Sequence, residues 1–281
     1  YEIQCCLVGS VMCIRDRHSG DYMTFGTDGG NERLRIASGG QVIIGDDDID
    51  KANGNFDDLI VGANASTTET HGITIVCGNA ATNGGIAFSD GSAGGADAYR
   101  GMISYQHNDN HMQFRTNAVE RLRIHSGGEV TKLHNPRFQV YMSGSHFQLS
   151  SGSGTITYNS EVYDTGSNYD TSTGRFTAPV SGAYYFHHCL QIREALSGTG
   201  VIEAKVWVIP NGSSGSGTER IRDYTRVDNT NAASHAFGLL GLNAGDQVYP
   251  AYYNGISGNA YTQNNGGNTP LTTFFEGYLV Q

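Results

Sequence analysis

The sequence predicts an all-β protein with two parts, an elongated shaft that contains a repeat and a C-terminal jelly roll of two sheets with about ten strands. Three observations support this prediction. One motif of eleven residues occurs twice in the first half of the chain. Apolar and polar residues alternate with the two-residue period of strands, and no segment has the pattern of a long amphipathic helix. Clusters of Gly, Asn, Asp and Ser, which favour turns, separate these segments.

The repeated motif is Glu-Arg-Leu-Arg-Ile-x-Ser-Gly-Gly-x-Val, which spans residues 32–42 and again residues 120–130. A Met-x-Phe-x-Thr segment precedes each copy, beginning at Met23 and at Met112. Within the motif, Leu and Ile alternate with Arg, as in a strand with one apolar face, and Ser-Gly-Gly predicts a turn. A supersecondary unit that recurs along a chain is typical of an elongated, modular β structure.

The first part of the chain has little apolar surface with which to build a core. Its connector, residues 51–100, is rich in Gly, Ala, Asn and Ser, and we expect strands in it at Gly72–Cys77 and Gly85–Phe88. Burial stabilises by about 25 cal/mol per Å² of apolar surface, whereas ordering the backbone costs about 1–2 kcal/mol per residue. One such chain is therefore poorly stabilised, and association would let identical chains share their thin apolar faces.

The second part begins after the linker Lys132–Arg137, where the strands become longer and more aromatic. Its pattern fits about ten strands without a helix, which is what a two-sheet jelly roll requires. We therefore divide the chain into residues 1–17, 18–133 and 134–281. In one expected strand, one face carries Tyr184, Phe186 and Leu190, and the opposite face carries Tyr185, His187 and Cys189. In another, one face carries Ala204, Val206 and Val208, and the opposite face carries Trp207.

Residues 1–17 resemble a peptide that recurs in metagenomic translations when sequencing-adapter DNA is read as coding sequence. Their apolar stretch has no basic segment before it and no small-residue cleavage pattern after it, both of which a signal peptide would show. We therefore expect residues 1–17 to be non-native. Outside them only Cys77 and Cys189 remain, too few for a disulfide scaffold, and both are expected to act as small apolar side chains.

Residues 18–133 resemble the repeats of tail fibres from marine and cyanobacterial phages. The twice-repeated motif carries this resemblance, together with Tyr99-Arg100-Gly101 and the segment Phe88-Ser-Asp-Gly. The resemblance implies a trimeric, fibrous β shaft that belongs to a virion and attaches to other tail proteins.

The second part of the chain contains a specific pattern, Thr-Gly-x-Phe-Thr-x-Pro-Val-x-Gly-x-Tyr-x-Phe, and two later landmarks, Leu242–Val248 and Phe275–Leu279. The residues that form the pattern are Thr173, Gly174, Phe176, Thr177, Pro179, Val180, Gly182, Tyr184 and Phe186. With these motifs, residues 136–281 resemble the globular head of complement component 1q, a relative of tumour necrosis factor. The resemblance implies a compact trimeric jelly roll in which Phe176, Tyr184 and Phe186 fill the core, while Gly174 and Gly182 lie at turns. The chain lacks the collagen stalk of the animal complement protein, so the immune role does not follow.

Composition and motifs exclude several classes of function. The net charge of −10 argues against a nucleic-acid partner, and no apolar run is long enough to predict membrane insertion. No nucleophile elbow, zinc-protease motif, P-loop or dinucleotide-binding fingerprint is present. We therefore predict neither an enzyme nor a cofactor. A carboxylate pair for glycan hydrolysis, as in a polysaccharide-degrading tailspike, stays open as a less favoured alternative.

Three groups of residues contain side chains that can bind metal ions, and none of the three is predicted to do so. Asp46–Asp50 lacks the spacing and the Gly of a calcium loop. His107 and His111 flank a turn and would need further ligands, from across the hairpin or from symmetry mates. His187 and His188 are adjacent on a strand and so face opposite sides.

Binding is expected at the long loops of the second part, because loops on a rigid scaffold carry recognition. These loops are Glu194–Gly200, Pro210–Glu219, Asp228–His235 and Asn254–Asn268. Tyrosines beside the last loop would stack on sugar rings or peptide side chains, although Tyr252 has the alternative of packing internally. The candidate binding residues are Tyr252, Tyr253, Tyr261, Asn254, Asn264 and Asp228.

The best hypothesis from the sequence is a homotrimeric phage tail fibre on the virion, with a head that binds a host cell-surface glycan or protein. The alternative is a secreted or surface-attached bacterial binding protein with the same head, outside the cell or on its surface.

Overall fold

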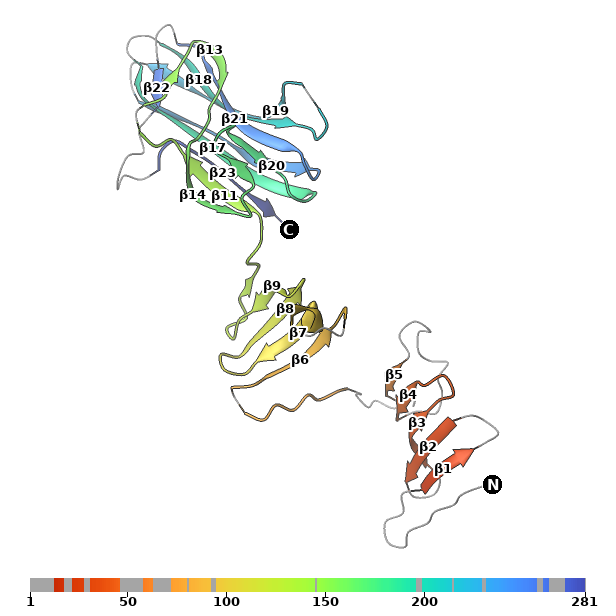
Figure 1. Cartoon of the computed structure of the whole chain (residues 1–281). Coiled ribbons are helices and arrows are strands. Elements are labelled where there is room, and N and C mark those ends of the chain that lie inside the picture. Colours follow the sequence, from red (N-terminus) through yellow and green to blue (C-terminus); the bar gives the residue numbers. More distant parts are fainter. Residues whose placement is uncertain are drawn as a thin grey trace. The chain divides into compact units, whose positions relative to one another are not determined.

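In this computed structural model the described residues form four β-sheets (Figure 1). Within the described residues the one helical element is η2, a 3-10 turn at Gly95–Tyr99, and no helix there has the length and apolar character needed to cross a membrane. The all-β prediction is confirmed for these residues. The structure describes residues 13–17, 22–27, 31–45, 58–62, 72–79, 81–91, 95–144, 146–195, 199–213, 215–228, 231–256, 260–262 and 271–280.

The first copy of the repeat builds sheet A, whose strands lie side by side in chain order. The last two strands of this sheet run parallel and the other neighbours antiparallel. The sheet includes residues 13–17 as an edge strand, so this part of the predicted non-native segment pairs with the repeat. The strands are β1 (Cys13–Arg17), β2 (Tyr22–Thr27), β3 (Asn31–Ile36), β4 (Val42–Ile44) and β5 (Leu59–Val61).

The second copy builds sheet B, in the order β10-β9-β8-β7-β6. Phe114 faces Leu122 here as Phe25 faces Leu34 in sheet A, and a register shift follows the Phe in both sheets. The same sequence therefore forms the same bulged hairpin twice. The strands are β6 (Asn83–Phe88), β7 (Gly101–Gln106), β8 (His111–Thr116), β9 (Val119–Ile124) and β10 (Val130–Thr131).

The spacing of Glu, Arg and Gly that the two copies share has a local structural cause. Glu32 and Glu120 each accept two hydrogen bonds from the Arg three residues on, with N–O distances between 2.6 and 2.8 Å. The last Gly of each Ser-Gly-Gly turn, Gly40 or Gly128, has φ near +90°, where a side chain is strained. The motif thus encodes a charge-paired strand followed by a turn that needs glycine.

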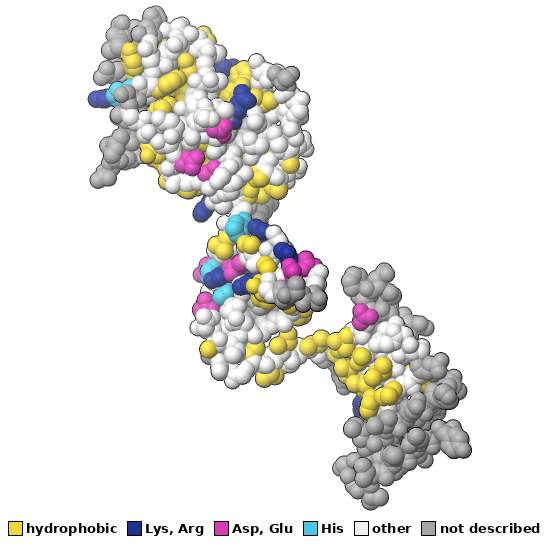
Figure 2. All heavy atoms as spheres, in the orientation of Figure 1, with side chains coloured by type: hydrophobic (Ala, Val, Ile, Leu, Met, Phe, Trp, Pro, Cys, Tyr) yellow, Lys and Arg dark blue, Asp and Glu magenta, His cyan; other side chains and the backbone are white. Residues whose placement is uncertain are grey.

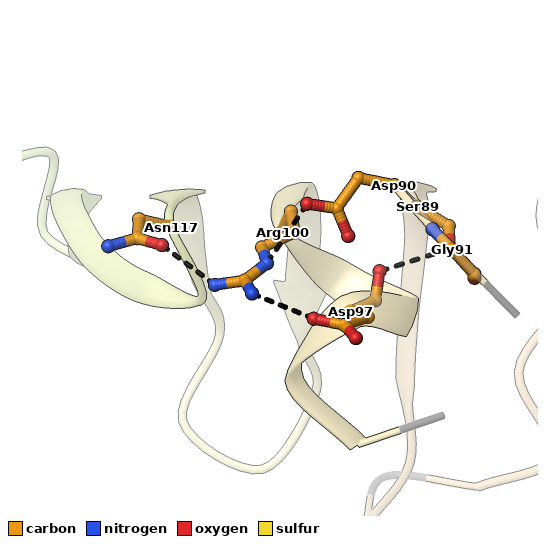
Figure 3. Close-up of polar contacts among 6 residues, drawn as sticks. All are labelled: Ser89, Asp90, Gly91, Asp97, Arg100 and Asn117. Atoms are coloured by element: carbon orange, nitrogen blue, oxygen red, sulfur yellow. Dashed lines mark hydrogen bonds and ion pairs between the residues drawn. The ribbon is translucent and has the colours of Figure 1, made fainter. Parts of the chain in front are cut away.

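Arg100 joins the other segments on which the tail-fibre resemblance rests. Its guanidinium lies 3.1 Å from a carboxylate oxygen of Asp90 and 2.7 Å from one of Asp97, and it donates a 2.9 Å hydrogen bond to Asn117 (Figure 3). Ser89 also donates to the backbone carbonyl of Asp97. The Phe-Ser-Asp-Gly and Tyr-Arg-Gly segments therefore meet at the Arg100 guanidinium, which also links them to the tip of the β8–β9 hairpin.

Among the described residues of 18–133, many apolar side chains are exposed to solvent. Met112 on β8 and Met23 on β2 are 37% and 40% exposed, and Ile103 and Tyr105 on β7 are similarly exposed. Figure 2 shows apolar side chains on these surfaces. The predicted strand at 72–77 is wrong, because these residues pair with no strand and Val76 is 86% exposed. The thin core expected from composition is present.

The second part of the chain is a jelly roll of two sheets. Sheet C has the order β12-β22-β17-β23-β11-β14 with β20 also on β17, and sheet D has the order β15-β16-β21-β18-β19 with β13 also on β21. The described part of this region has thirteen strands, three more than the predicted ten. Four of them, β12, β15, β16 and β22, are only two or three residues long. The strands are β11 (Arg137–Tyr141), β12 (Gln148–Leu149), β13 (Gly152–Thr155), β14 (Ser160–Thr165), β15 (Tyr169–Asp170), β16 (Arg175–Thr177), β17 (Gly182–Ala195), β18 (Thr199–Ile209), β19 (Thr218–Asp228), β20 (Ala232–Leu242), β21 (Gln247–Asn254), β22 (Ala260–Thr262) and β23 (Phe274–Val280).

An aromatic core lies between sheets C and D. Phe138 stacks on Phe176 with ring centroids 4.8 Å apart, and it meets Phe275 edge to face at 5.1 Å. The predicted core residues Phe176, Tyr184 and Phe186 are fully buried, which confirms that prediction. Rings at these offset and T-shaped separations attract one another beyond the effect of burial alone.

The two glycines predicted at turns differ in their roles. Gly174 is in a turn with φ +71°, as expected. Gly182 instead begins β17, and a β-carbon there would lie 2.7 Å from the end of Leu279. Gly182 therefore lies in a strand and not in a turn, and its neighbour on β23 is the movable end of the Leu279 side chain.

Candidate functional site

The outward face of sheet C carries a row of unusual side chains. Cross-strand pairing aligns Tyr163, Gln139, Glu276, His187 and Phe237 across β14, β11, β23, β17 and β20. Side chains paired in this way point to the same face of a sheet. Phe237 is 60% exposed at one end of the row and Tyr163 is 40% exposed at the other.

A second row lies one pleat away on the same face. Tyr278 pairs with Tyr185, with ring centroids 5.2 Å apart, and Tyr185 pairs with Leu239 on β20. Leu239 is 63% exposed and Tyr278 is 46% exposed. We call these two rows the aromatic face. Exposed apolar side chains that gather on one face of a protein are typical of interaction sites.

Histidines occupy the centre of the aromatic face. His187 Nε2 lies 3.1 Å from His235 Nδ1, and His187 Nδ1 lies 3.3 Å from a carboxylate oxygen of Glu276. Phe237 and Phe274 both meet the His187 ring edge to face. Either imidazole can donate in the His187–His235 hydrogen bond, depending on the tautomers of the two rings.

The neighbouring His188 faces the opposite way, as predicted. It is fully buried, and its Nδ1 donates to the carbonyl of Lys205 while its Nε2 accepts from the hydroxyl of Tyr158. Burial lowers the pKa of His188 to about 3 and raises that of Tyr158. Both groups are therefore neutral, and they hold β17, β18 and the segment before β14 together.

The other metal-ligand candidates give no site in the structure. Asp46–Asp50 lies outside the described residues. His107 lies in the β7–β8 turn, where its ring meets Tyr105 edge to face at 4.9 Å, and His111 begins β8 with 7% of its surface exposed. Across the described part of the chain, no group of three or more His, Cys, Asp or Glu is arranged to hold a metal ion.

Two of the six candidate binding residues are buried, which corrects the prediction for them. Tyr252 is 5% exposed and its hydroxyl accepts a hydrogen bond from the backbone of Ser150, so it packs internally. Asn254 is fully buried, donates to the carbonyl of Leu149 and accepts from the backbone of Ile256. Alternation along β21 points these two side chains inward and leaves the residue between them outside.

The remaining candidates have different surroundings. Tyr253 is 37% exposed on the outward face of sheet D, and Asp228 is exposed at the end of β19. Tyr261 is half-buried on β22, opposite Gln148. Asn264 lies outside the described residues. The predicted loops are shorter than expected, because β17 continues to Ala195, β20 begins at Ala232 and β22 lies within the segment predicted as the last loop.

Sequence reasoning missed the neighbours of Tyr253. Glu203 on β18 pairs with Tyr253 on one side and with Tyr224 on the other, and Tyr224 is 69% exposed. Lys205 lies 2.9 Å from Glu203 and 5.6 Å from the Tyr253 ring centroid. The two-residue alternation of β18 and β19 indicates that Glu203 and Tyr224 point outward. Only the pairing of the two strands in the structure shows that these side chains are neighbours.

Comparisons with known proteins match the jelly roll. The family model described as C1q domain matches residues 138–280. Among solved structures, the globular domain of zebrafish complement 1qA protein is 20% identical, with 52% of this chain and 98% of that chain covered and a TM-score of 0.36. Eiger TNF from S. frugiperda is 11% identical, with 52% and 93% covered and a TM-score of 0.42. Murine APRIL is 12% identical, with 52% and 99% covered and a TM-score of 0.40. No curated protein matches the chain.

Proposed function

We propose that the chain, which belongs to the C1q domain family, is a phage tail fibre with a trimeric adhesive head. Members of this family are typically non-enzymatic binding modules, which supports the adhesive head. The tail fibre itself rests on the resemblance of the repeats in residues 18–133. In this proposal residues 134–281 form the head, which binds a glycan or a protein on the host cell surface without catalysing a reaction. Residues 18–133 form the shaft, the other end of which joins further tail proteins of the virion.

The aromatic face is the observation that carries the trimeric assembly. C1q and tumour-necrosis-factor-like domains commonly trimerise. Phe237, Leu239 and Tyr278 expose 60%, 63% and 46% of their surfaces in one chain. Removing apolar surface from water stabilises by about 25 cal/mol per Å², so covering these side chains with a second and third copy favours assembly.

The shaft gives a second argument for shared burial. Each repeat hairpin buries little on its own, and Met23, Met112, Ile103 and Tyr105 remain exposed. Three chains around one axis would cover both these side chains and the aromatic face, because head and shaft would then share one symmetry.

The first experiment measures the oligomeric state. Light scattering on the full chain should give three times 30.1 kDa. Phe237→Arg should yield monomers, because it places a charge in the proposed interface at a position that is exposed in the single chain. The matched control is Tyr224→Arg, at a position 69% exposed on sheet D, which should stay trimeric. A monomeric wild type, or equal behaviour of the two variants, contradicts the proposal.

The second experiment tests the adhesive role. Trimeric protein should bind intact cells of the phage's host, and neighbouring genes should encode capsid or baseplate proteins. Genes for bacterial surface or secretion functions in their place would favour the bacterial binding protein. Release of reducing ends from capsular polysaccharide would favour the tailspike and would contradict a head without catalysis.

A further inference from the structure

Beside sheet D lies a cavity of about 280 Å³, away from the aromatic face. Its polar lining comes from Thr155 at the end of β13, Thr173 in the turn before β16, Arg175 at the start of β16 and Ser216 before β19. Tyr249 and Ile209 also line it. This volume lies just below the range of about 300–1,000 Å³ for small-molecule sites, so it suits at most one sugar-sized ring.

The cavity lies where the pairing along one edge of β21 is interrupted. β13 pairs with residues 251–254 of β21 and β16 pairs with residues 247–248, so neither strand pairs with residues 249–250. The chain leaves β13 with a single hydrogen bond from Ile156 to Pro250. Gly174, with φ +71°, lets the β15–β16 hairpin approach Thr157 closely. A β-carbon on residue 174 would lie 3.0 Å from the Cα of Thr157.

Arg175 brings to this cavity a positive charge that forms no ion pair among the described residues. Its guanidinium lies over the ring of Tyr249 at 5.6 Å and donates a 2.9 Å hydrogen bond to the uncharged side chain of Gln247. Within the described chain no carboxylate lies at ion-pair distance from it. Asp170, its cross-strand partner, instead accepts hydrogen bonds from Ser172 and Thr173.

Hydroxyl groups complete the wall of the cavity. Among the described residues, the side chains of Thr155 and Ser216 have no hydrogen-bond partner, and Thr173 uses its hydroxyl to donate to Asp170, which leaves its oxygen able to accept. A guanidinium held in place by stacking pairs well with a planar carboxylate, and hydroxyls pair with the hydroxyls of a sugar.

We propose that this cavity binds a carboxylated pyranose, such as a uronic or nonulosonic acid residue of a cell-surface glycan, with its carboxylate on Arg175. The proposal names a ligand class within the adhesive role proposed above and rests on that role only for the source of the sugar. The chain as a whole carries a net charge of −10, so recognition of an anion depends on this local cation.

The test is titration of the full chain with sodium glucuronate and, separately, with N-acetylneuraminate, followed by saturation-transfer NMR. The glucuronate methyl ester and glucose serve as uncharged controls. Arg175→Gln should raise the dissociation constant for the acid by roughly tenfold or more, because a hydrogen bond to a charged group is lost. Arg226→Gln removes an arginine from the same sheet outside the cavity and should leave binding unchanged.

Binding of either acid that depends on Arg175 supports the inference, and the acid that binds identifies the source. No binding of either acid, equal binding of the methyl ester, or equal loss in both arginine variants overturns it. Light scattering and cell adhesion in the same samples separate the two proposals. Trimers that adhere to cells but bind no acid refute only the cavity. Acid binding without adhesion refutes only the adhesive role.

Discussion

Acid should destabilise the head through His188. This imidazole is fully buried between the hydroxyl of Tyr158 and the carbonyl of Lys205, and burial lowers its pKa to about 3. In the unfolded chain the same group has the ordinary imidazole pKa of about 6.5. Between these two values the unfolded state binds a proton that the folded state does not, so stability is complete above about pH 6.5 and falls as the pH falls.

The size of the effect follows from the two pKa values. Each pH unit below the unfolded value costs about 1.4 kcal/mol until the folded value is reached. At pH 5 the folded head should therefore lose about 2 kcal/mol relative to pH 7 from this one residue. With a urea dependence of about 2 kcal/mol per molar, the unfolding midpoint should fall by roughly 1 M.

The assay is urea denaturation at pH 7, 6 and 5, at one protein concentration because assembly adds to apparent stability. Trp207 is the single tryptophan of the chain and lies on β18, so its fluorescence reports on the head alone. His188→Gln is the comparison, since its amide is neutral throughout this range. The variant should start less stable but lose about 2 kcal/mol less between pH 7 and pH 5. Equal pH dependence in the two proteins would refute the reasoning.

Three further predictions concern packing, backbone conformation and thiol chemistry. Phe176→Ala should cost about 3–5 kcal/mol in urea unfolding, because the ring is fully buried against Phe138, and a loss below about 1 kcal/mol would contradict the packing described. Gly128→Ala should speed hydrogen exchange in sheet B more than Gly127→Ala, because only Gly128 has positive φ (+92°), where a side chain costs about 1–2 kcal/mol. Burial raises the pKa of Cys189 to about 11, so iodoacetamide at pH 8 should alkylate it at least about 100-fold more slowly than in urea, as read by peptide mass spectrometry. Equal rates would place this thiol in solvent.

The strand pattern was readable from the sequence because its causes are local. Alternation of small sets of side chains, such as Tyr184 and Phe186 against Tyr185 and His187, predicts two faces from a period of two. The turn glycines of the repeat follow from φ values that other residues avoid. The strand predicted at 72–77 failed for the opposite reason, because an apolar run becomes a strand only where a partner strand exists.

The candidate binding residues show the limit of local reasoning. Tyr252 and Tyr253 are alike in sequence, yet one packs in the core and the other faces solvent. The choice depends on which side of β21 meets sheet C, and this is a property of the packed sheets.

By itself the sequence determined that the chain is made of β-strands, that one hairpin motif occurs in it twice and that its second part has a jelly-roll pattern. Those features depend on residues close together in the chain. Only the tertiary structure decided that the aromatic face stays open, that His188 is buried neutral against Tyr158, and that Arg175 borders a cavity. Each of these depends on contacts between strands that are distant in sequence, because pairing and packing set which side chains are covered.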